Sequence, residues 1–190
     1  DRPNDGPSDG LIVVAKRDCP TCGLIEPLLH ELARGPDPLA VYVQDDERFA
    51  AGVPGALLDD TLERSFRLGI EFVPTLIRVQ DGREVARTYG WHRGDWQRIS
   101  GQPALGASLP ELRAGCGSMT LEPGVAEDLV VRFGHTGLAS RQVVLGDAED
   151  AIEACYDRGW TDGLPVVPPT AARVLRMLQG TSRQPDEVLG

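Results

Sequence analysis

The sequence predicts an α/β domain with a mixed β-sheet, followed by a C-terminal extension of irregular and helical segments. In the first half of the chain, short apolar runs alternate with segments of helical period, in the order β, α, β, α, β-hairpin, α. Near residue 102 the composition shifts to Gly, Pro, Ala and Ser without a sustained period. We therefore expect a lead-in at 1–9, a domain at 10–102, and an extension at 103–190.

Each element of the first domain has a local signal. Residues 11–15 are a continuous apolar run that suits a strand buried on both faces. Apolar residues between 24 and 32 recur at three and four, and Gly35-Pro36 ends that helix. Asp81-Gly82 is a hairpin signal. The remaining expected elements are a strand at 39–43, a helix capped by Asp60 and running to about Leu68, strands at 73–79 and 84–89, and a helix starting at 95–99.

The extension has weaker signals. Residues 129–133 and 142–145 are expected to pair as strands across 134–137. Asp147 is expected to cap a helix to about Arg158, and Thr170 a helix at 171–178. The prolines between 163 and 169 forbid regular structure there. Because its apolar stretches are short, we expect the extension to pack on the first domain, or to be the start of a further domain.

Composition and charge exclude several function classes. The 190-residue chain carries a formal charge of −10, whereas nucleic-acid binders and anchors for anionic lipids present basic faces. Its longest aliphatic run, at 11–15, is too short to cross a bilayer. We expect no nucleic acid, no membrane insertion and a cytoplasmic location, the last because no signal peptide is visible and cysteines are few.

Two of the four cysteines form a C-x-x-C pair where a strand meets a helix. A helix N-terminus favours the thiolate of the first cysteine, and the second lies one turn on, close enough to bridge. Pro20 suits the first helical turn. The spacing therefore predicts an exposed, nucleophilic Cys19 and a more buried, resolving Cys22.

Residues 11–100 resemble the thioredoxin-like superfamily. The matching pieces are Cys19-Pro20-Thr21-Cys22 after a strand, Val73-Pro74-Thr75, and the hairpin that ends at Tyr89-Gly90. The resemblance implies a cis-proline at Pro74 against the cysteine pair. It also implies a groove for a partner chain bordered by Val73, Pro74, Thr75, Gly90 and Trp91. The implied activity is thiol–disulfide exchange with a protein or small-molecule disulfide or thiol, and no cofactor or metal is implied.

The chain departs from the thioredoxin pattern at three places. Val13 stands where many thioredoxins carry a buried acid, and Asp18 where a tryptophan often precedes the first cysteine. A carboxylate beside Cys19 is expected to oppose the helix effect on its thiol. Pro20-Thr21 replaces the Gly-Pro of reducing members. The redox direction therefore stays open.

Alternatives remain for the cysteines. The pair is also compatible with a structural bridge, or with half of a zinc site completed by Cys116 and a histidine such as His92. Cys116, between glycines, is either an incidental loop thiol or a relay and second bridge partner for Cys19. Cys155 shares a helical face with Ala151 and Ile152 and is expected to be buried.

Two further functional hypotheses stand beside the enzyme. The domain is alternatively a redox-inactive docking or scaffold module, or a dedicated electron donor to a catalytic domain of the same longer polypeptide. Residues 150–190 show a weak resemblance to a segment of bacterial proteins associated with UGSC-type (seleno)proteins, for which no established chemistry is implied.

Overall fold

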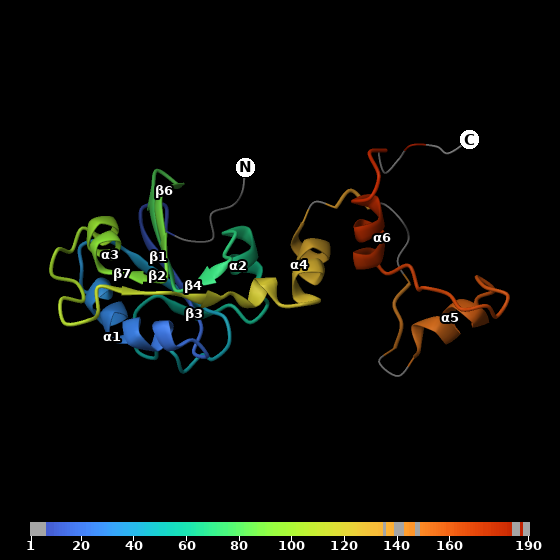
Figure 1. The fold of residues 1–190 in the computed structure, drawn as a ribbon, viewed down its shortest axis with the longest axis horizontal. Helices are drawn as coiled ribbons and strands as arrows, with labels where there is room; N and C mark the ends of the chain where they lie inside the picture. The colour runs from blue at the N-terminus through green and yellow to red at the C-terminus, as the bar shows by residue number, and fades with distance from the viewer. Residues whose placement is uncertain (1–6, 135, 139–142, 147–148, 184–186, 188–190) are drawn as a thin grey trace. The chain divides into compact units, whose positions relative to one another are not determined.

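The computed structural model describes residues 7–134, 136–138, 143–146, 149–183 and 187 (Figure 1). The chain divides into two compact units, Asp1–Leu129 and Val130–Gly190. The first unit therefore includes residues 103–129, which the change in composition near residue 102 assigned to the extension. Among the described residues, none of the helices is long and apolar enough to cross a membrane.

The first unit is built on a five-stranded mixed sheet in the order β3-β2-β1-β5-β6. The central strand β1 pairs in parallel with β2 and antiparallel with β5. All six residues of β1 are buried, as its continuous apolar run predicts. The strands of this sheet are β1 (Gly10–Ala15), β2 (Leu39–Val43), β3 (Ala56–Leu58), β5 (Thr75–Gln80) and β6 (Arg83–Tyr89).

Helix α1 (Pro20–Ala33) begins directly after β1 and carries the second cysteine of the pair. Its apolar residues at 25, 28, 29 and 32 are buried in the same core cluster as β1. This packing joins the helix to the sheet and brings its N-terminus to the end of β1, where the candidate site lies.

The next helix differs from its prediction. Helix α2 (Glu63–Arg67) is shorter than expected; Leu62 stands at its N-cap position, and the buried Asp59 rather than Asp60 supplies the carboxylate that caps its first turn. The Asp59 carboxylate accepts hydrogen bonds from the backbone N–H groups of Arg64 (3.1 Å) and Ser65 (2.8 Å). Either of two adjacent aspartates suits a cap locally, and here the one that faces the interior performs it.

The β5–β6 hairpin turns at Asp81-Gly82 as predicted, with positive φ at both residues (50° and 70°). A short strand β7 (Trp91–His92) leads into helix α3 (Arg93–Ser100). The Nδ1 of His92 accepts a hydrogen bond from Asp95 N–H at 3.2 Å and so caps α3.

Residues 103–129 pack on the sheet domain. Leu105 joins the core, β8 (Leu112–Arg113) pairs with β7, and β9 (Cys116–Gly117) pairs with β4 (Phe72–Val73). The 3-10 helix η1 (Met119–Leu121) and helix α4 (Val125–Phe133) follow.

The predicted strand at 129–133 is wrong, because these residues form the second half of α4. Acidic residues occupy its first turn and Arg132 its last, which suits the helix dipole. A short run of four apolar residues interrupted by one arginine does not by itself distinguish a strand from a helix. Of the partner strand that was expected at 142–145, residues 143–145 form no strand, and Gln142 lies outside the described residues.

In the second unit, helix α5 (Ala151–Asp157) is capped by Asp150, and the predicted cap Asp147 lies outside the described residues. Helix α6 (Ala171–Leu178) has the predicted bounds and the predicted Thr170 cap. Cys155 is buried, as expected, and lines an apolar cavity of about 370 Å³ within this unit.

Candidate functional site

Cys19 and Cys22 lie at the junction of β1 and α1. Cys19 is the N-cap of α1, with extended backbone (φ −149°), and its Sγ accepts a hydrogen bond from Cys22 N–H at 3.4 Å. Cys22, one turn later, has no exposed surface, and its Sγ accepts a bond from Lys16 N–H at 3.5 Å. The thiols are unbridged in this structure. Both cysteines therefore lie at the start of α1, one helical turn apart, as the C-x-x-C spacing predicts.

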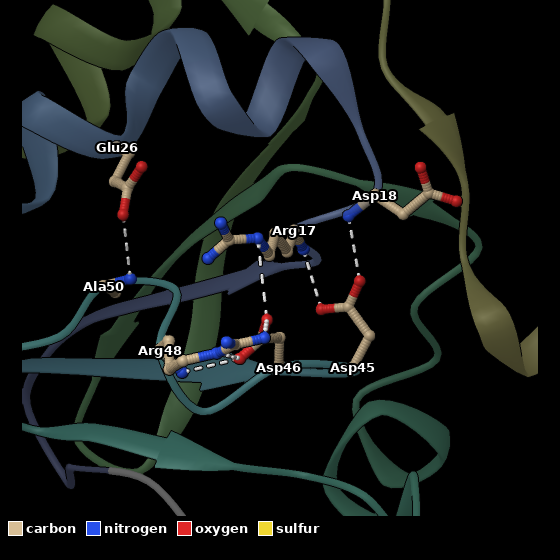
Figure 2. A network of polar contacts seen from close by, with 7 residues as sticks. All are labelled: Arg17, Asp18, Glu26, Asp45, Asp46, Arg48 and Ala50. Carbon is tan, nitrogen blue, oxygen red and sulfur yellow. Dashed lines mark hydrogen bonds and ion pairs between the residues drawn. The ribbon is translucent and has the colours of Figure 1, made fainter.

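Acidic residues after β2 hold the loop that presents Cys19 (Figure 2). The Asp45 carboxylate accepts hydrogen bonds from the N–H groups of Arg17 (2.7 Å) and Asp18 (2.9 Å). Asp46 binds the guanidinium of Arg48 at 2.8 Å and lies 3.5 Å from that of Arg17. The loop before the first cysteine is therefore tied to the end of the neighbouring strand.

The Val73–Pro74 peptide bond is cis, as the resemblance predicts. The Cys19 thiol donates to the Val73 carbonyl oxygen at 3.7 Å, which brings this segment to the cysteine pair. Thr75 is fully buried, and its Oγ1 donates to the Phe72 carbonyl at 2.6 Å. This bond closes the turn around Pro74, so that Thr75 has a structural part in the site.

The prediction of an exposed Cys19 is wrong. Its exposed fraction is 2%, because the chain's own residues 111–118, here called the covering segment, lie across it. Within this segment Cys116 pairs with Val73, and the Cys116 thiol hydrogen-bonds the Cys19 sulfur. Thr21 Oγ1 donates to the Ala114 carbonyl at 2.6 Å and clamps the segment to α1. The spacing of residues around Cys19 could not predict this burial, because the covering segment lies more than ninety residues later in the chain.

The three neighbouring thiols have different acidities. Burial opposes ionisation of Cys19, but hydrogen bonds from Cys116 and from the start of α1 outweigh it and lower the pKa of Cys19. Burial raises the pKa of Cys22 far above that of an ordinary thiol. Burial, and then the bond to Cys19 and its charge, raise the pKa of Cys116. Cys19 is therefore the thiol that ionises first.

Gly90 and Gly115 let the covering segment approach closely. Gly90 has φ of +64°, and a Cβ built on it would lie 2.7 Å from Gly115 N. A Cβ on Gly115 would lie 2.6 Å from the Val73 carbonyl oxygen. The space between Gly90 and Val73 therefore admits the covering segment only because residue 115 has no side chain.

Trp91 is fully buried, packs 5.4 Å from Trp96 between ring centroids, and donates from Nε1 to the Pro110 carbonyl at 2.6 Å. In this structure it supports the start of the covering segment. Gly90 and Val73 likewise contact the chain itself, so their predicted part in binding an outside partner stays a prediction.

A buried polar network holds the end of the covering segment. Gln44 Nε2 donates to Ser65 Oγ (2.9 Å) and Ser118 Oγ (2.8 Å), and Gln44 Oε1 accepts from Met119 N–H at 3.1 Å. Ser118 N–H donates to the Glu71 carbonyl at 2.9 Å. Sequence reasoning missed this network, because single Gln and Ser residues far apart in the chain carry no local signal.

No family model matches the chain, and no curated protein does. Among solved structures, Malassezia sympodialis thioredoxin is 19% identical with a TM-score of 0.36, over 52% of this chain and 77% of that one. The Schistosoma mansoni thioredoxin pre-protein is 21% identical with a TM-score of 0.34, over 50% and 80%. A second Schistosoma mansoni thioredoxin structure is 27% identical with a TM-score of 0.29, over 44% and 67%.

The architecture of the first unit itself agrees with the predicted fold. A mixed five-stranded sheet places the cysteine pair at the start of α1, and a cis-proline segment lies against the first cysteine. The first unit is a thioredoxin-like α/β domain, and a helical region follows it.

Proposed function

We propose that this protein is a thiol–disulfide oxidoreductase that uses Cys19 as nucleophile and Cys22 as resolving thiol. The observation that carries the proposal is the placement of two unbridged thiols one helical turn apart at the start of α1, with the cis Val73–Pro74 segment against the first thiol. The pKa of Cys19 is lowered by hydrogen bonds to its sulfur, whereas burial keeps Cys22 protonated. Cys19 is thus the thiol that attacks the partner, and Cys22 stays protonated until it attacks the mixed disulfide.

In the reducing direction, the Cys19 thiolate attacks one sulfur of a partner disulfide. A Cys19–partner disulfide forms, and the other partner sulfur leaves as a thiolate that takes up a proton. Cys22 then loses its proton and attacks Cys19 Sγ, which releases the second partner thiol and leaves a Cys19–Cys22 disulfide. The partner gains two electrons and the cysteine pair loses two; the oxidising direction is the reverse.

A partner disulfide reaches Cys19 only when the covering segment moves, because Cys116 and Val73 now occupy the surroundings of its sulfur. The same edge of β4, with its backbone hydrogen-bonding groups, suits an extended partner chain. An extended protein disulfide or a small disulfide is therefore the substrate class that we propose. Neither step draws on a cofactor, because the cysteine pair carries both electrons.

The test is reduction of insulin by dithiothreitol with and without the protein. We expect acceleration that the Cys19→Ser variant loses. No acceleration, with Cys19–Cys22 locked as a bridge that dithiothreitol does not open, would instead support the docking or scaffold module. The reduction potential of the pair then tells a reductase from an oxidant or isomerase.

One observation favours a second candidate, a dedicated electron donor to a catalytic domain of a longer polypeptide. Cys19 has an exposed fraction of 2%, so a general substrate meets a covered sulfur. A dedicated partner that displaces the covering segment would reach an exposed Cys19 sulfur. This candidate predicts weak insulin reduction together with ready reduction of the Cys19–Cys22 bridge by dithiothreitol.

A further inference from the structure

Cys19 has two thiol neighbours, and they come from different parts of the chain. Cys22 lies on the same helix and donates its backbone N–H to Cys19 Sγ. Cys116 lies on β9, where it pairs with Val73, and its side chain interacts with that of Cys19. Both residues thus lie next to Cys19 Sγ, the sulfur through which any mixed disulfide on Cys19 would form.

The position of Cys116 is built by backbone contacts on both of its sides. Its own residue pairs with Val73, whose carbonyl oxygen contacts Cys19 Sγ. Two residues earlier, the Ala114 carbonyl accepts from Thr21 Oγ1, and two residues later Ser118 N–H donates to the Glu71 carbonyl. Such positioning makes attack on Cys19 intramolecular, with a high effective concentration.

We propose that Cys116 is a second resolving thiol, which attacks mixed disulfides on Cys19 and forms an internal Cys19–Cys116 bridge. This inference rests on the proposed function, because it requires Cys19 to form mixed disulfides.

The step balances for a small disulfide such as oxidised glutathione. The Cys19 thiolate attacks one glutathione sulfur, and the other glutathione leaves as a thiolate that takes up a proton. Cys116 then loses its proton and attacks Cys19 Sγ, which breaks the Cys19–glutathione bond and forms the Cys19–Cys116 bond. The second glutathione leaves and takes up a proton. In sum, glutathione disulfide is reduced and two protein thiols are oxidised.

The surroundings of the two resolving thiols differ in a way that lets Cys116 compete. Cys22 is fully buried, and burial is the largest cause that raises the pKa of its thiol, ahead of its interactions with Cys19 and Cys116. Cys116 is partly exposed, and part of the rise in its pKa comes from its bond to Cys19 and from the charge there. That part disappears once Cys19 is in a mixed disulfide, because its sulfur is then neutral.

The bridge would also change access to the site. A Cys19–Cys116 bond joins the covering segment to α1 covalently and keeps an outside disulfide from Cys19. In a further exchange, Cys22 attacks Cys19 Sγ, the Cys19–Cys22 bond forms and Cys116 leaves as a thiol. This exchange releases the covering segment while the protein keeps one disulfide, so it needs no oxidant or reductant. Cys22 and Cys116 thereby select between an open and a closed oxidised form.

The test uses the full chain treated with oxidised glutathione, quenched with acid and mapped by mass spectrometry of peptides. Four variants are compared: Cys22→Ser, Cys22→Ala, Cys116→Ser and the double Cys22→Ser/Cys116→Ser. In both single variants at Cys22 we expect the Cys19–Cys116 bridge to exceed Cys19–glutathione by at least about tenfold, given the effective concentrations of positioned groups. The alanine variant guards against misfolding caused by a buried hydroxyl.

The double variant separates the two proposals. Glutathione on Cys19 in the double variant shows a reactive Cys19, and its disappearance when Cys116 is restored supports the second resolving thiol. Persistent glutathione on Cys19 in both single Cys22 variants overturns the role of Cys116 and leaves the proposed function intact. An unmodified Cys19 in the double variant overturns the proposed function and this inference with it.

Discussion

The two regions that meet at Cys19 are built in different ways. The β1–α1 side consists of a strand buried at every residue and a helix whose apolar face joins the main core. Most of the covering segment is exposed, and Leu112 leaves 66% of its surface in contact with solvent. The segment depends on two two-residue strand pairs and a few side-chain hydrogen bonds.

Because of this difference, Cys22 is a fixed neighbour of Cys19, whereas Cys116 can move away from it. Moving Cys22 away would require opening the core, whereas moving Cys116 away requires the loss of a few hydrogen bonds and little apolar burial. The same nucleophile is thus held by a rigid region and covered by a less stable one. The predictions below test this contrast, from the largest expected effect to the smallest.

The largest effect is expected from Cys19→Ser. Serine is a far weaker nucleophile near neutral pH, so the rate of insulin reduction should fall by more than about 100-fold. Cys155→Ala, which removes a thiol of the second unit, serves as the control and should keep the wild-type rate. A Cys19→Ser protein with wild-type activity would exclude Cys19 as the attacking thiol.

Gly115→Ala should uncover Cys19. The new Cβ would lie 2.6 Å from the Val73 carbonyl oxygen, so the covering segment must shift outward. We expect the alkylation rate of Cys19 with iodoacetamide, followed by mass mapping, to rise roughly tenfold, as for loss of a weakly held segment. Cys22 should stay protected in both proteins.

Gly117→Ala is the matched control for that experiment. It adds the same methyl group to the same segment, yet its Cβ would have no heavy atom of the described chain outside its sequence neighbours within 4 Å. Cys19 should therefore react at the wild-type rate. Equal rates in Gly115→Ala and Gly117→Ala would show that the segment does not control access.

Cys116→Ala should move the acidity of Cys19. Its thiol hydrogen bond is one of the contacts that lower the pKa of Cys19, so its removal should raise that pKa. The midpoint of the pH profile for Cys19 alkylation should then shift to higher pH, and Cys116→Ser, which keeps a donor, should shift it less. A midpoint that moves downward in Cys116→Ala would contradict the assigned hydrogen bond.

The smallest effect is expected from Thr21→Val, which removes one hydrogen bond to the Ala114 carbonyl while keeping the side-chain shape. One such bond contributes about 1 kcal/mol, so the covered form should lose about fivefold in population relative to open forms. Faster alkylation of Cys19 in Thr21→Val, with the wild-type rate in Thr21→Ser, would confirm the clamp. Unchanged rates in both would assign the cover to the strand pairs alone.

Local signals in the sequence determined much of the first unit and one helix of the second. The apolar run of β1, the spacing of apolar residues in α1, the Asp81-Gly82 turn and the Thr170 cap each depend on residues within a few positions of one another. The roles of the C-x-x-C pair were predicted in the same way, from residues one helical turn apart, whereas the cis bond at Val73–Pro74 was implied by the resemblance to thioredoxin-like proteins. The prediction from the short, mostly apolar run at 129–133 was wrong, because its length and pattern suit both a strand and a helix.

Tertiary structure alone decided what surrounds the cysteine pair. The cover over Cys19 depends on residue 116 pairing with residue 73, and its anchor on Gln44 reaching Ser118. The cap of α2 likewise depends on which of two adjacent aspartates faces the interior. These contacts join residues far apart in the chain or depend on burial, and such arrangements are set by the packing of the whole core rather than by any local pattern.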